Sequence, residues 1–337
     1  MTSLTLANVL AARRRISGVA TLDTPLVPSP YLSRLCGGDF LLKLEIGQAT
    51  GAFKLRGAAN AVLNLPADAP GVTCCSTGNH GRAIAFAARA RGLKAVVCMS
   101  KLVPQAKVDG IRALGAEARI IGESQDDAQF ESRRLADQDG FCEVSPFDDP
   151  HVIAGQGTIG LELLQQRPDL ETVLIPLSGG GLAGGIAATV KQIKPSIRVI
   201  GITMDRGAAM HESVKAGHPV PVTEVASLAD SLGGGIGAEN RHSFALCQKY
   251  LDDIVLVTED EIYCAMQAHY FEDRLVCEGA SAVGAAALIA GKLGKTLGPT
   301  ASIITGRNVD MTVFTDIVSG RDVRLGAMML KGKPHAA

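Results

Sequence analysis

Short apolar segments alternate with helix-like segments along most of this chain, and this alternation limits the possible folds more than any other feature of the sequence. Apolar strands separated by helices are typical of mostly parallel sheets that helices cover on both faces. The expected strands are Phe40–Leu44, Val72–Cys75, Ala95–Met99, Ala118–Ile121, Val173–Leu177, Val199–Thr203, Ile254–Val257 and Ser302–Ile304. The sequence therefore predicts an α/β protein.

Helices are expected between these strands, and one more precedes them. Thr258 is a credible N-cap, because Glu261 stands three residues later and completes a capping box. A chain of 337 residues is long for a single core, which favours two domains. The other expected helices are Met1–Ile16, about Phe53–Leu63, Asn79–Arg91, Pro104 to near Gly115, Asp126–Gln138 and Val152–Gln165.

Composition argues against several classes of function. The net charge is −1, aromatic residues make up 4% and Trp is absent, so nothing suggests a nucleic-acid-binding surface. No apolar run reaches the roughly 18–20 residues that a membrane-spanning helix needs. The arginines at 13–15 follow an apolar stretch, the reverse of a secretory signal. We expect a cytoplasmic protein whose eight cysteines are reduced and mostly buried, without a zinc site.

Three loops that suit a ligand follow expected strands. Ser76 follows one strand, Ser178 another and Thr305 a third. In open α/β sheets, ligands bind beyond the carboxyl ends of the strands. Three such ends that point at one crevice indicate a site more strongly than any single loop.

Lys54 is the first candidate for chemistry. A lysine that burial makes less basic is a nucleophile for a carbonyl and can hold an aldehyde as a Schiff base. A single lysine at a helix start is more often a surface charge. Its neighbours favour function, because Phe53 could pack beside an aromatic ring and Gly51 and Gly57 allow close backbone approach.

Two glycine-containing loops could bind anions. Gly179, Gly180 and Gly181 follow a strand and open a helix, so amide groups and the helix dipole can meet a phosphate. A plain tight turn explains this run equally well, and neither a Walker ending nor a dinucleotide fingerprint is present. Amide groups at the start of the helix from Asn79, with the Ser76 hydroxyl, suit a substrate carboxylate.

Thr305 begins a fourth candidate, Thr305-Gly306-Arg307-Asn308. A hydroxyl at a strand end can form a hydrogen bond with a pyridine nitrogen without protonating it. Viewed alone, this segment is better explained by a simple turn.

Together these segments resemble the fold-type II pyridoxal-phosphate family of threonine dehydratases and serine racemases, from about Leu22 to Asp310. Six matches in the family's order carry the resemblance. They are Gly51-Ala52-Phe53-Lys54-Leu55-Arg56-Gly57, Ser76-Thr77-Gly78-Asn79-His80-Gly81, Val152-Ile153-Ala154-Gly155-Gln156-Gly157-Thr158, the loop 178–182, Glu278, and Thr305-Gly306-Arg307-Asn308-Val309-Asp310.

The resemblance implies a role for each matching position. Lys54 would form the Schiff base with pyridoxal 5'-phosphate and move the α-proton. The other cofactor-binding residues would be Phe53 against the ring, Asn79 at the ring oxygen, Ser178, Gly179, Gly180, Gly181 and Leu182 around the phosphate, Glu278 near the ring and Thr305 at the pyridine nitrogen. The substrate would contact Ser76, Gly78, Asn79, His80 and Arg307, and Thr77 stands where racemases use a serine as second acid or base.

The resemblance also implies an architecture like that of the tryptophan synthase β chain, with two open, mostly parallel sheets covered by helices. Residues 1–70 and 149–337 would form a large cofactor-binding domain, and 71–148 a small mobile domain that closes over substrate. Homodimers are common in the family. The implied activity is elimination of a β-hydroxyl from a hydroxy amino acid, which yields a 2-oxo acid and ammonia.

Departures from the family pattern narrow the expectation. Thr203 and Ala209 stand where many relatives carry the acids of a divalent-cation site, so we expect no metal. The extra methyl of Thr77 puts racemisation in doubt. The chain ends at Ala337, so we expect no carboxyl-terminal regulatory domain. Arg307 replaces a usual glycine and could select an acidic or acylated substrate.

Arg307 and two further segments are similar to a subgroup associated with hydroxyectoine utilisation. The segments are Thr203-Met204-Asp205-Arg206-Gly207-Ala208-Ala209-Met210 and Ser231-Leu232-Gly233-Gly234-Gly235-Ile236-Gly237. The alternatives are a serine or threonine ammonia-lyase or racemase of general amino-acid metabolism, and a non-catalytic protein that binds the cofactor for regulation.

Overall fold

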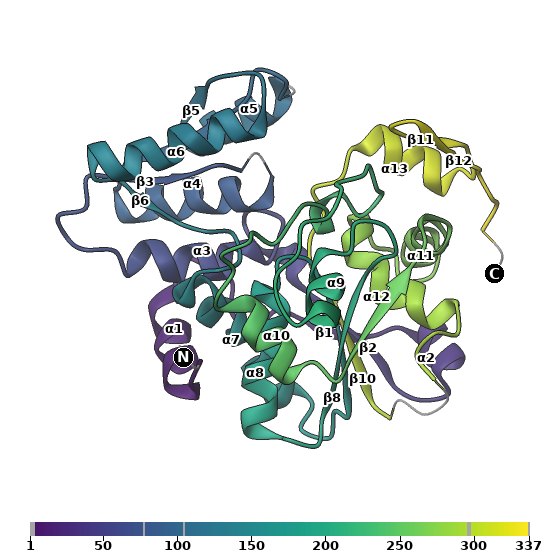
Figure 1. Cartoon of the computed structure of the whole chain (residues 1–337). Coiled ribbons are helices and arrows are strands. Elements are labelled where there is room, and N and C mark those ends of the chain that lie inside the picture. Colours follow the sequence, from purple (N-terminus) through teal and green to yellow (C-terminus); the bar gives the residue numbers. More distant parts are fainter. Residues whose placement is uncertain (1–3, 77, 104, 295–297, 336–337) are drawn as a thin grey trace.

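Two separate sheets organise the chain (Figure 1). The structure is a computed structural model, which describes residues 4–76, 78–103, 105–294 and 298–335. One sheet has six strands and the other four, and all pairings but one in these two sheets are parallel. The predicted α/β architecture with two open, mostly parallel sheets is therefore confirmed.

The larger sheet has the order β1-β2-β10-β7-β8-β9. β1 is the antiparallel strand at its edge. The bounds are β1 Leu26–Pro28, β2 Phe40–Leu44, β7 Thr172–Pro176, β8 Arg198–Met204, β9 Asp253–Val257 and β10 Thr300–Ile304. The predicted strands agree with these within two residues at each end.

The larger sheet is buried on both faces. In β8, Ile200 and Ile202 pack into one hydrophobic cluster, whereas Val199 packs into another on the opposite side. This alternation follows from the two-residue repeat of a strand. The elements that surround this sheet are α2 Pro30–Cys36, α7 Pro150–Gln166, α8 Gly181–Ile193, α9 Ala209–Ala216, α10 Ser243–Tyr250, α11 Glu259–Phe271, α12 Gly279–Ile289 and α13 Met311–Val318.

The smaller sheet has the order β5-β4-β3-β6 and lies at the upper left of Figure 1. Val97 and Met99 of β4 pack toward α4, while Val96 and Cys98 pack toward α6. Its strands are β3 Val72–Cys74, β4 Ala95–Met99, β5 Glu117–Ile120 and β6 Cys142–Glu143, and its helices are α4 Asn79–Arg91, α5 Gln105–Ala113 and α6 Gln125–Asp139. All of them fall inside the stretch 71–148 that the sequence assigns to a small domain.

Two further helices, α1 (Leu6–Ile16) and α3 (Lys54–Leu63), complete the surroundings of the site. α1 packs on α7, and α3 packs on both α4 and α7. α3 and α7 approach closely, because a side chain at Gly57 would come within 2.7 Å of the Val152 carbonyl oxygen. The expected close backbone approach at Gly57 is therefore observed.

Several elements were not predicted. β1 and α2 lie in the stretch before β2, and β6 is only two residues long. A hairpin formed by β11, Val323–Leu325, and β12, Met328–Leu330, ends the fold near α13.

Two local predictions can be checked directly. Thr258 caps α11, and both hydrogen bonds of its capping box with Glu261 are present. None of the eight cysteines forms a disulfide; four are buried and four are half-buried. Among the described residues, no helix is long and apolar enough to cross a membrane.

Candidate active site

Lys54 is the first residue of α3, and its side chain contacts the segment between β6 and α7. Its Nζ donates a hydrogen bond to the Pro146 carbonyl oxygen at 2.7 Å and lies 5.3 Å from the centre of the Phe53 ring. The side chain keeps a little exposed surface, but the protein atoms that bury its ammonium lower its pKa to about 8. Its contacts provide no carboxylate to hold the charge, which is the condition expected for a nucleophilic amine.

The glycine loop between β7 and α8 forms a tight, backbone-lined cradle. Gly180 has φ of 86°, and helix α8 begins after it without a side-chain cap. A side chain at Gly179 would come within 2.3 Å of the Phe147 ring, so the loop tolerates little beyond hydrogen there. Uncapped amide groups at a helix start bind anions well.

The segment 146–148 joins Lys54 to this loop, a connection that sequence analysis did not predict. The Pro146 carbonyl accepts from Lys54, and Phe147 packs against the glycines. The Asp148 carboxylate accepts backbone N–H bonds from His242 and Ser243 at 2.8 Å each. Ser243 Oγ in turn donates to the Gly179 carbonyl oxygen at 2.6 Å, and this hydrogen bond holds the glycine loop in place.

Glu278 connects three segments that are distant in the sequence. Its carboxylate accepts from Asn79 Nδ2 at 3.0 and 3.1 Å, from the Asn308 backbone N–H at 2.9 Å and from Ser231 Oγ at 3.3 Å. Burial raises the pKa of Glu278, and the hydrogen bonds from Asn79 and Asn308 oppose that rise. This carboxyl therefore connects α4, which packs on the smaller sheet, to segments that adjoin the larger sheet.

Thr305 lies directly beside the lysine segment. Its carbonyl accepts from the Phe53 N–H at 2.9 Å, and its Oγ1 is 3.0 Å from Ser281 Oγ. The backbone N–H of Arg307 donates to the Gly51 carbonyl, while the Arg307 side chain is exposed. Ser281 is a further polar contact of this strand end that sequence analysis missed.

The loop from Ser76 to Gly81 enters helix α4. A side chain at Gly81 would come within 2.0 Å of the Ser76 carbonyl oxygen. His80 is buried, its Nε2 lies 2.9 Å from the Val144 carbonyl oxygen, and its Nδ1 has no partner among the described groups. Burial, with the nearby Lys54 charge, lowers the pKa of His80 to about 3, so its ring is neutral at pH 7. Thr77 lies outside the described residues.

A fully buried ion cluster anchors helix α3 on its other side. Arg56 donates to Glu45 at 2.8 Å and to Glu162 at 2.6 Å, and Lys43 Nζ donates to Glu162 at 2.7 Å. All four side chains have no exposed surface. Burial opposes the charge on Arg56, but these carboxylates raise its pKa overall. Sequence analysis did not predict this cluster.

Several of the predicted cofactor residues thus lie in one contact network, although they come from segments of both sheets. Lys54, the loop 178–182 and Thr305 meet through Pro146, Phe147 and the Phe53 backbone, and Asn79 joins through Glu278. No group of three or more metal-ligating side chains occurs among the described residues. A weakly basic amine, an uncapped amide cradle and a strand-end hydroxyl fit an aldehyde that carries a phosphate.

Comparison with known proteins identifies the family. Residues 19–306 match the family described as "Pyridoxal-phosphate dependent enzyme". A putative threonine dehydratase of Sinorhizobium fredii is 52% identical over 322 residues, which cover 95% of this chain and 97% of that protein. An L-threonine ammonia-lyase of Thermotoga maritima is 36% identical, with 96% of this chain and 80% of that protein covered.

Solved structures agree with the sequence matches. The processed threonine deaminase isoform 2 of Solanum lycopersicum superposes with a TM-score of 0.86 at 36% identity, over 93% of this chain and 86% of that one. The serine racemase of Dictyostelium discoideum superposes with a TM-score of 0.84 at 31% identity, over 92% and 100%. The chain therefore belongs to the pyridoxal-phosphate-dependent enzyme family, among its threonine dehydratase-like members.

Proposed function

We propose that this enzyme removes the β-hydroxyl and the amino group of a hydroxy amino acid, which leaves a 2-oxo acid and ammonia. The observation that carries the proposal is Lys54, a buried amine whose lowered pKa suits both attack on an aldehyde and proton transfer. The relatives named threonine dehydratase and threonine ammonia-lyase support the same reaction class.

Pyridoxal 5'-phosphate, when bound, supplies an aldehyde for amines and a ring that withdraws electrons from the substrate α-carbon. Lys54 would hold it covalently, and Phe53 would pack against its ring. Asn79 would contact its ring oxygen, Glu278 would lie near the ring, and Thr305 would face its nitrogen. The phosphate would sit on the amide groups of the loop, namely Ser178, Gly179, Gly180, Gly181 and Leu182.

The loop 76–81 would hold the substrate carboxylate. The start of α4 has no side-chain cap, so its backbone amides would bind the carboxylate together with the Ser76 hydroxyl and Gly78, and neutral His80 adds no competing charge. Asn79 is already oriented by Glu278, which fixes one edge of this subsite. The arrangement would hold the carboxylate while leaving the α-carbon toward Lys54.

Lys54 would then take the α-proton onto Nζ. The Pro146 carbonyl, which accepts from Nζ at 2.7 Å, would orient the amine and stabilise its ammonium form. The β-hydroxyl leaves with a proton as water, and hydrolysis of the released enamine gives the 2-oxo acid and ammonia. A Thr305 hydroxyl at the ring nitrogen, rather than an acid, favours prompt elimination over a long-lived carbanion.

Movement of the small domain would close the site. We propose that residues 71–148 shift relative to the rest of the chain, with the Asn79–Glu278 and Asn79–Asn308 hydrogen bonds as contacts of the closed form.

We also propose a homodimer, on the family resemblance alone. Thr77 is proposed as an acid on the second face of the substrate, which formation of D-serine from L-serine by wild type but not by Thr77→Ala would support.

Arg307 is the residue proposed to set substrate choice. Its backbone is fixed to Gly51, three residues before Lys54, and its exposed side chain adds a cation at this edge of the site. A cation there favours a substrate with a second acidic or acylated group. The hydroxyectoine breakdown product is one such substrate, and a role in hydroxyectoine degradation is proposed on this basis.

An assay of 2-oxo acid and ammonia release tests both levels of the proposal. We expect turnover of at least one of threonine, serine, 3-hydroxyaspartate and hydroxyectoine-derived diamino acids. Arg307→Gly should lower kcat/KM for the acidic or acylated substrates and spare threonine. If wild type turns over threonine far faster than the other substrates, the hydroxyectoine proposal is wrong. If the cofactor-loaded protein turns over none of the substrates, the proposed elimination reaction is wrong.

A further inference from the structure

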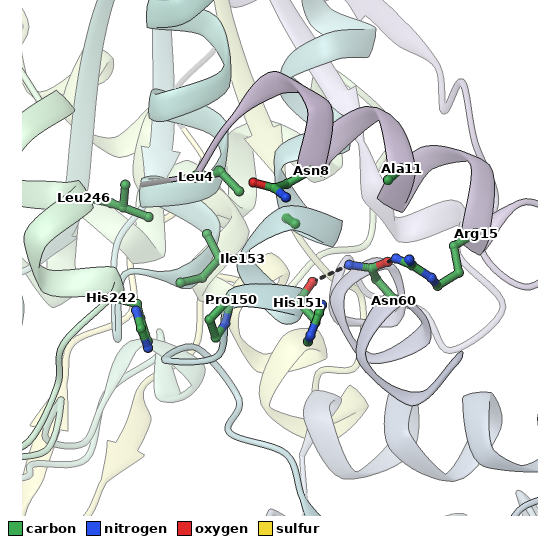
Figure 2. A pocket seen from close by; sticks show the side chains of 11 residues that line it. Leu4, Asn8, Ala11, Arg15, Asn60, Pro150, His151, Ile153, His242 and Leu246 are labelled. Atoms are coloured by element: carbon green, nitrogen blue, oxygen red, sulfur yellow. Dashed lines mark hydrogen bonds between the residues drawn. The ribbon is translucent and has the colours of Figure 1, made fainter. Parts of the chain in front are cut away.

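A second cavity lies outside the cofactor site, between the amino-terminal helix and the large domain. It has a volume of about 230 Å³ and is walled by α1, α3, the start of α7 and α10 (Figure 2). One wall is apolar, with Leu4, Ile153 and Leu246. The opposite wall is polar, and it contains Arg15 and Asn60.

The lining of the cavity contains one permanent cation, Arg15, and no acid. Arg15, His151 and His242 line the cavity, and none of its lining residues is Asp or Glu. Arg15 donates to Asn60 Oδ1 at 2.5 Å, and no described carboxylate pairs with it. Its neighbour on the helix, Arg13, differs: it is paired with Asp23 and Glu162. An unpaired guanidinium with several free donors suits a carboxylate.

The walls of this cavity are also attached to the cofactor site. Asn60 is six residues after Lys54 on α3, and its Nδ2 donates to the His151 carbonyl oxygen at 2.7 Å. His151 follows Pro146, the Lys54 partner, by five residues. His242 adjoins Ser243, whose hydroxyl holds the Gly179 carbonyl.

We propose that this cavity binds a small aliphatic carboxylate and that its occupancy is coupled to the cofactor site. The carboxylate would lie on Arg15 and its hydrocarbon body on Leu4, Ile153 and Leu246. A ligand that shifts α3, the 146–151 segment or α10 would move the partners of Lys54 or of the glycine loop. Such a ligand would change the affinity of the protein for the cofactor by some factor. Binding linkage then requires the cofactor to change the affinity for the carboxylate by the same factor.

Titration calorimetry of the cofactor-loaded protein with butyrate tests the binding. We expect saturable binding of butyrate and none of butylamine, which has a similar hydrocarbon body and the opposite charge. Arg15→Gln should weaken butyrate binding by at least about tenfold. Arg14→Gln, an exposed arginine on the same helix, should leave it unchanged. Ala11→Phe, which fills the cavity from α1, should also weaken binding, so the test does not depend on one variant.

Other results would overturn the proposed binding or the proposed coupling. Failure of butyrate to bind, or equal binding by Arg15→Gln and wild type, would overturn the assignment. Inorganic phosphate that binds as tightly as butyrate would overturn the role of the apolar wall. The apparent cofactor affinity should change when butyrate is added to wild type but not to Arg15→Gln, and identical cofactor affinity with and without saturating butyrate would overturn the coupling.

Discussion

Lys54 and Arg56 lie two residues apart on helix α3, both are cations removed from most solvent, and their surroundings are opposite. Arg56 contacts two carboxylates and keeps its charge, whereas Lys54 contacts a carbonyl oxygen and has its pKa lowered to about 8. The difference teaches that burial alone does not set the role of a charged group. A paired cation holds structure, and an unpaired one becomes a nucleophile.

Replacing Lys54 by alanine should produce the largest effect on chemistry and little effect on stability. Loss of the amine removes both the covalent attachment and the proton carrier, so turnover should fall by about 10⁴-fold or more. Ammonia release and the visible absorbance of the lysine-bound cofactor measure the two losses. A Lys54→Ala protein that retains more than about a hundredth of wild-type turnover would contradict the assignment.

Replacing Arg56 by methionine should have the opposite profile. It leaves Glu45 and Glu162 buried without their shared cation, which should cost about 3–5 kcal/mol in free energy of unfolding. Arg167→Gln is the matched control, because Arg167 pairs with Asp39 and Asp169 at the surface, where such pairs contribute up to about 1 kcal/mol. Denaturant unfolding measures the free energy of unfolding of both variants relative to wild type. Equal losses in the two variants would show that the buried cluster stabilises the fold no more than a surface ion pair does.

The pH dependence of stability should report the same cluster. Burial opposes the Glu162 charge, but hydrogen bonds and charges from Arg56 and Lys43 lower its pKa to about 2. A lowered carboxyl pKa gives stability that is present above the unfolded value, near 4.3, and is lost as pH falls toward 2. The contribution of Glu162 is about 3 kcal/mol. The free energy of unfolding is measured against pH for wild type and for Glu162→Gln, and the difference between the two profiles gives this contribution. Parallel profiles would contradict the lowered pKa of Glu162.

The smallest expected effect concerns the rate at which Lys54 captures the cofactor. Only the neutral amine attacks an aldehyde, so a pKa of about 8 predicts a rate that rises about tenfold from pH 7 to pH 9 and then levels off. An ordinary lysine would keep gaining rate beyond pH 10. Stopped-flow absorbance after mixing cofactor with the cofactor-free protein distinguishes the two, and a rise without a plateau near pH 9 would mean that Lys54 is not unusually acidic.

Much of the fold was accessible from sequence because the strands are apolar runs with clear ends. Phe40–Leu44 and Ala95–Met99 were predicted with their observed bounds. The edge strand Leu26–Pro28 was missed, since three residues that end in proline give no two-residue pattern. The short β6 was missed for the same reason of length.

The site was predictable where side-chain type carries the chemistry. Lys54 and the glycines after Ser178 were proposed on this basis. Pro146 was not, because it acts through its backbone carbonyl, which every residue has. The pairing of Arg56 with Glu162 joins residues that are 106 positions apart, and no local pattern marks it.

Borohydride reduction followed by peptide mass spectrometry tests the central claim most directly. Two lysines of the described chain have opposite surroundings: Lys43 is fully buried against Glu162, and Lys54, which keeps a little exposed surface, contacts a carbonyl oxygen. Protein loaded with pyridoxal 5'-phosphate and then reduced should carry the added mass on the peptide that contains Lys54, and Lys43 should remain unmodified. Label on Lys43 or another lysine, or no label in a fully loaded protein, would contradict the account.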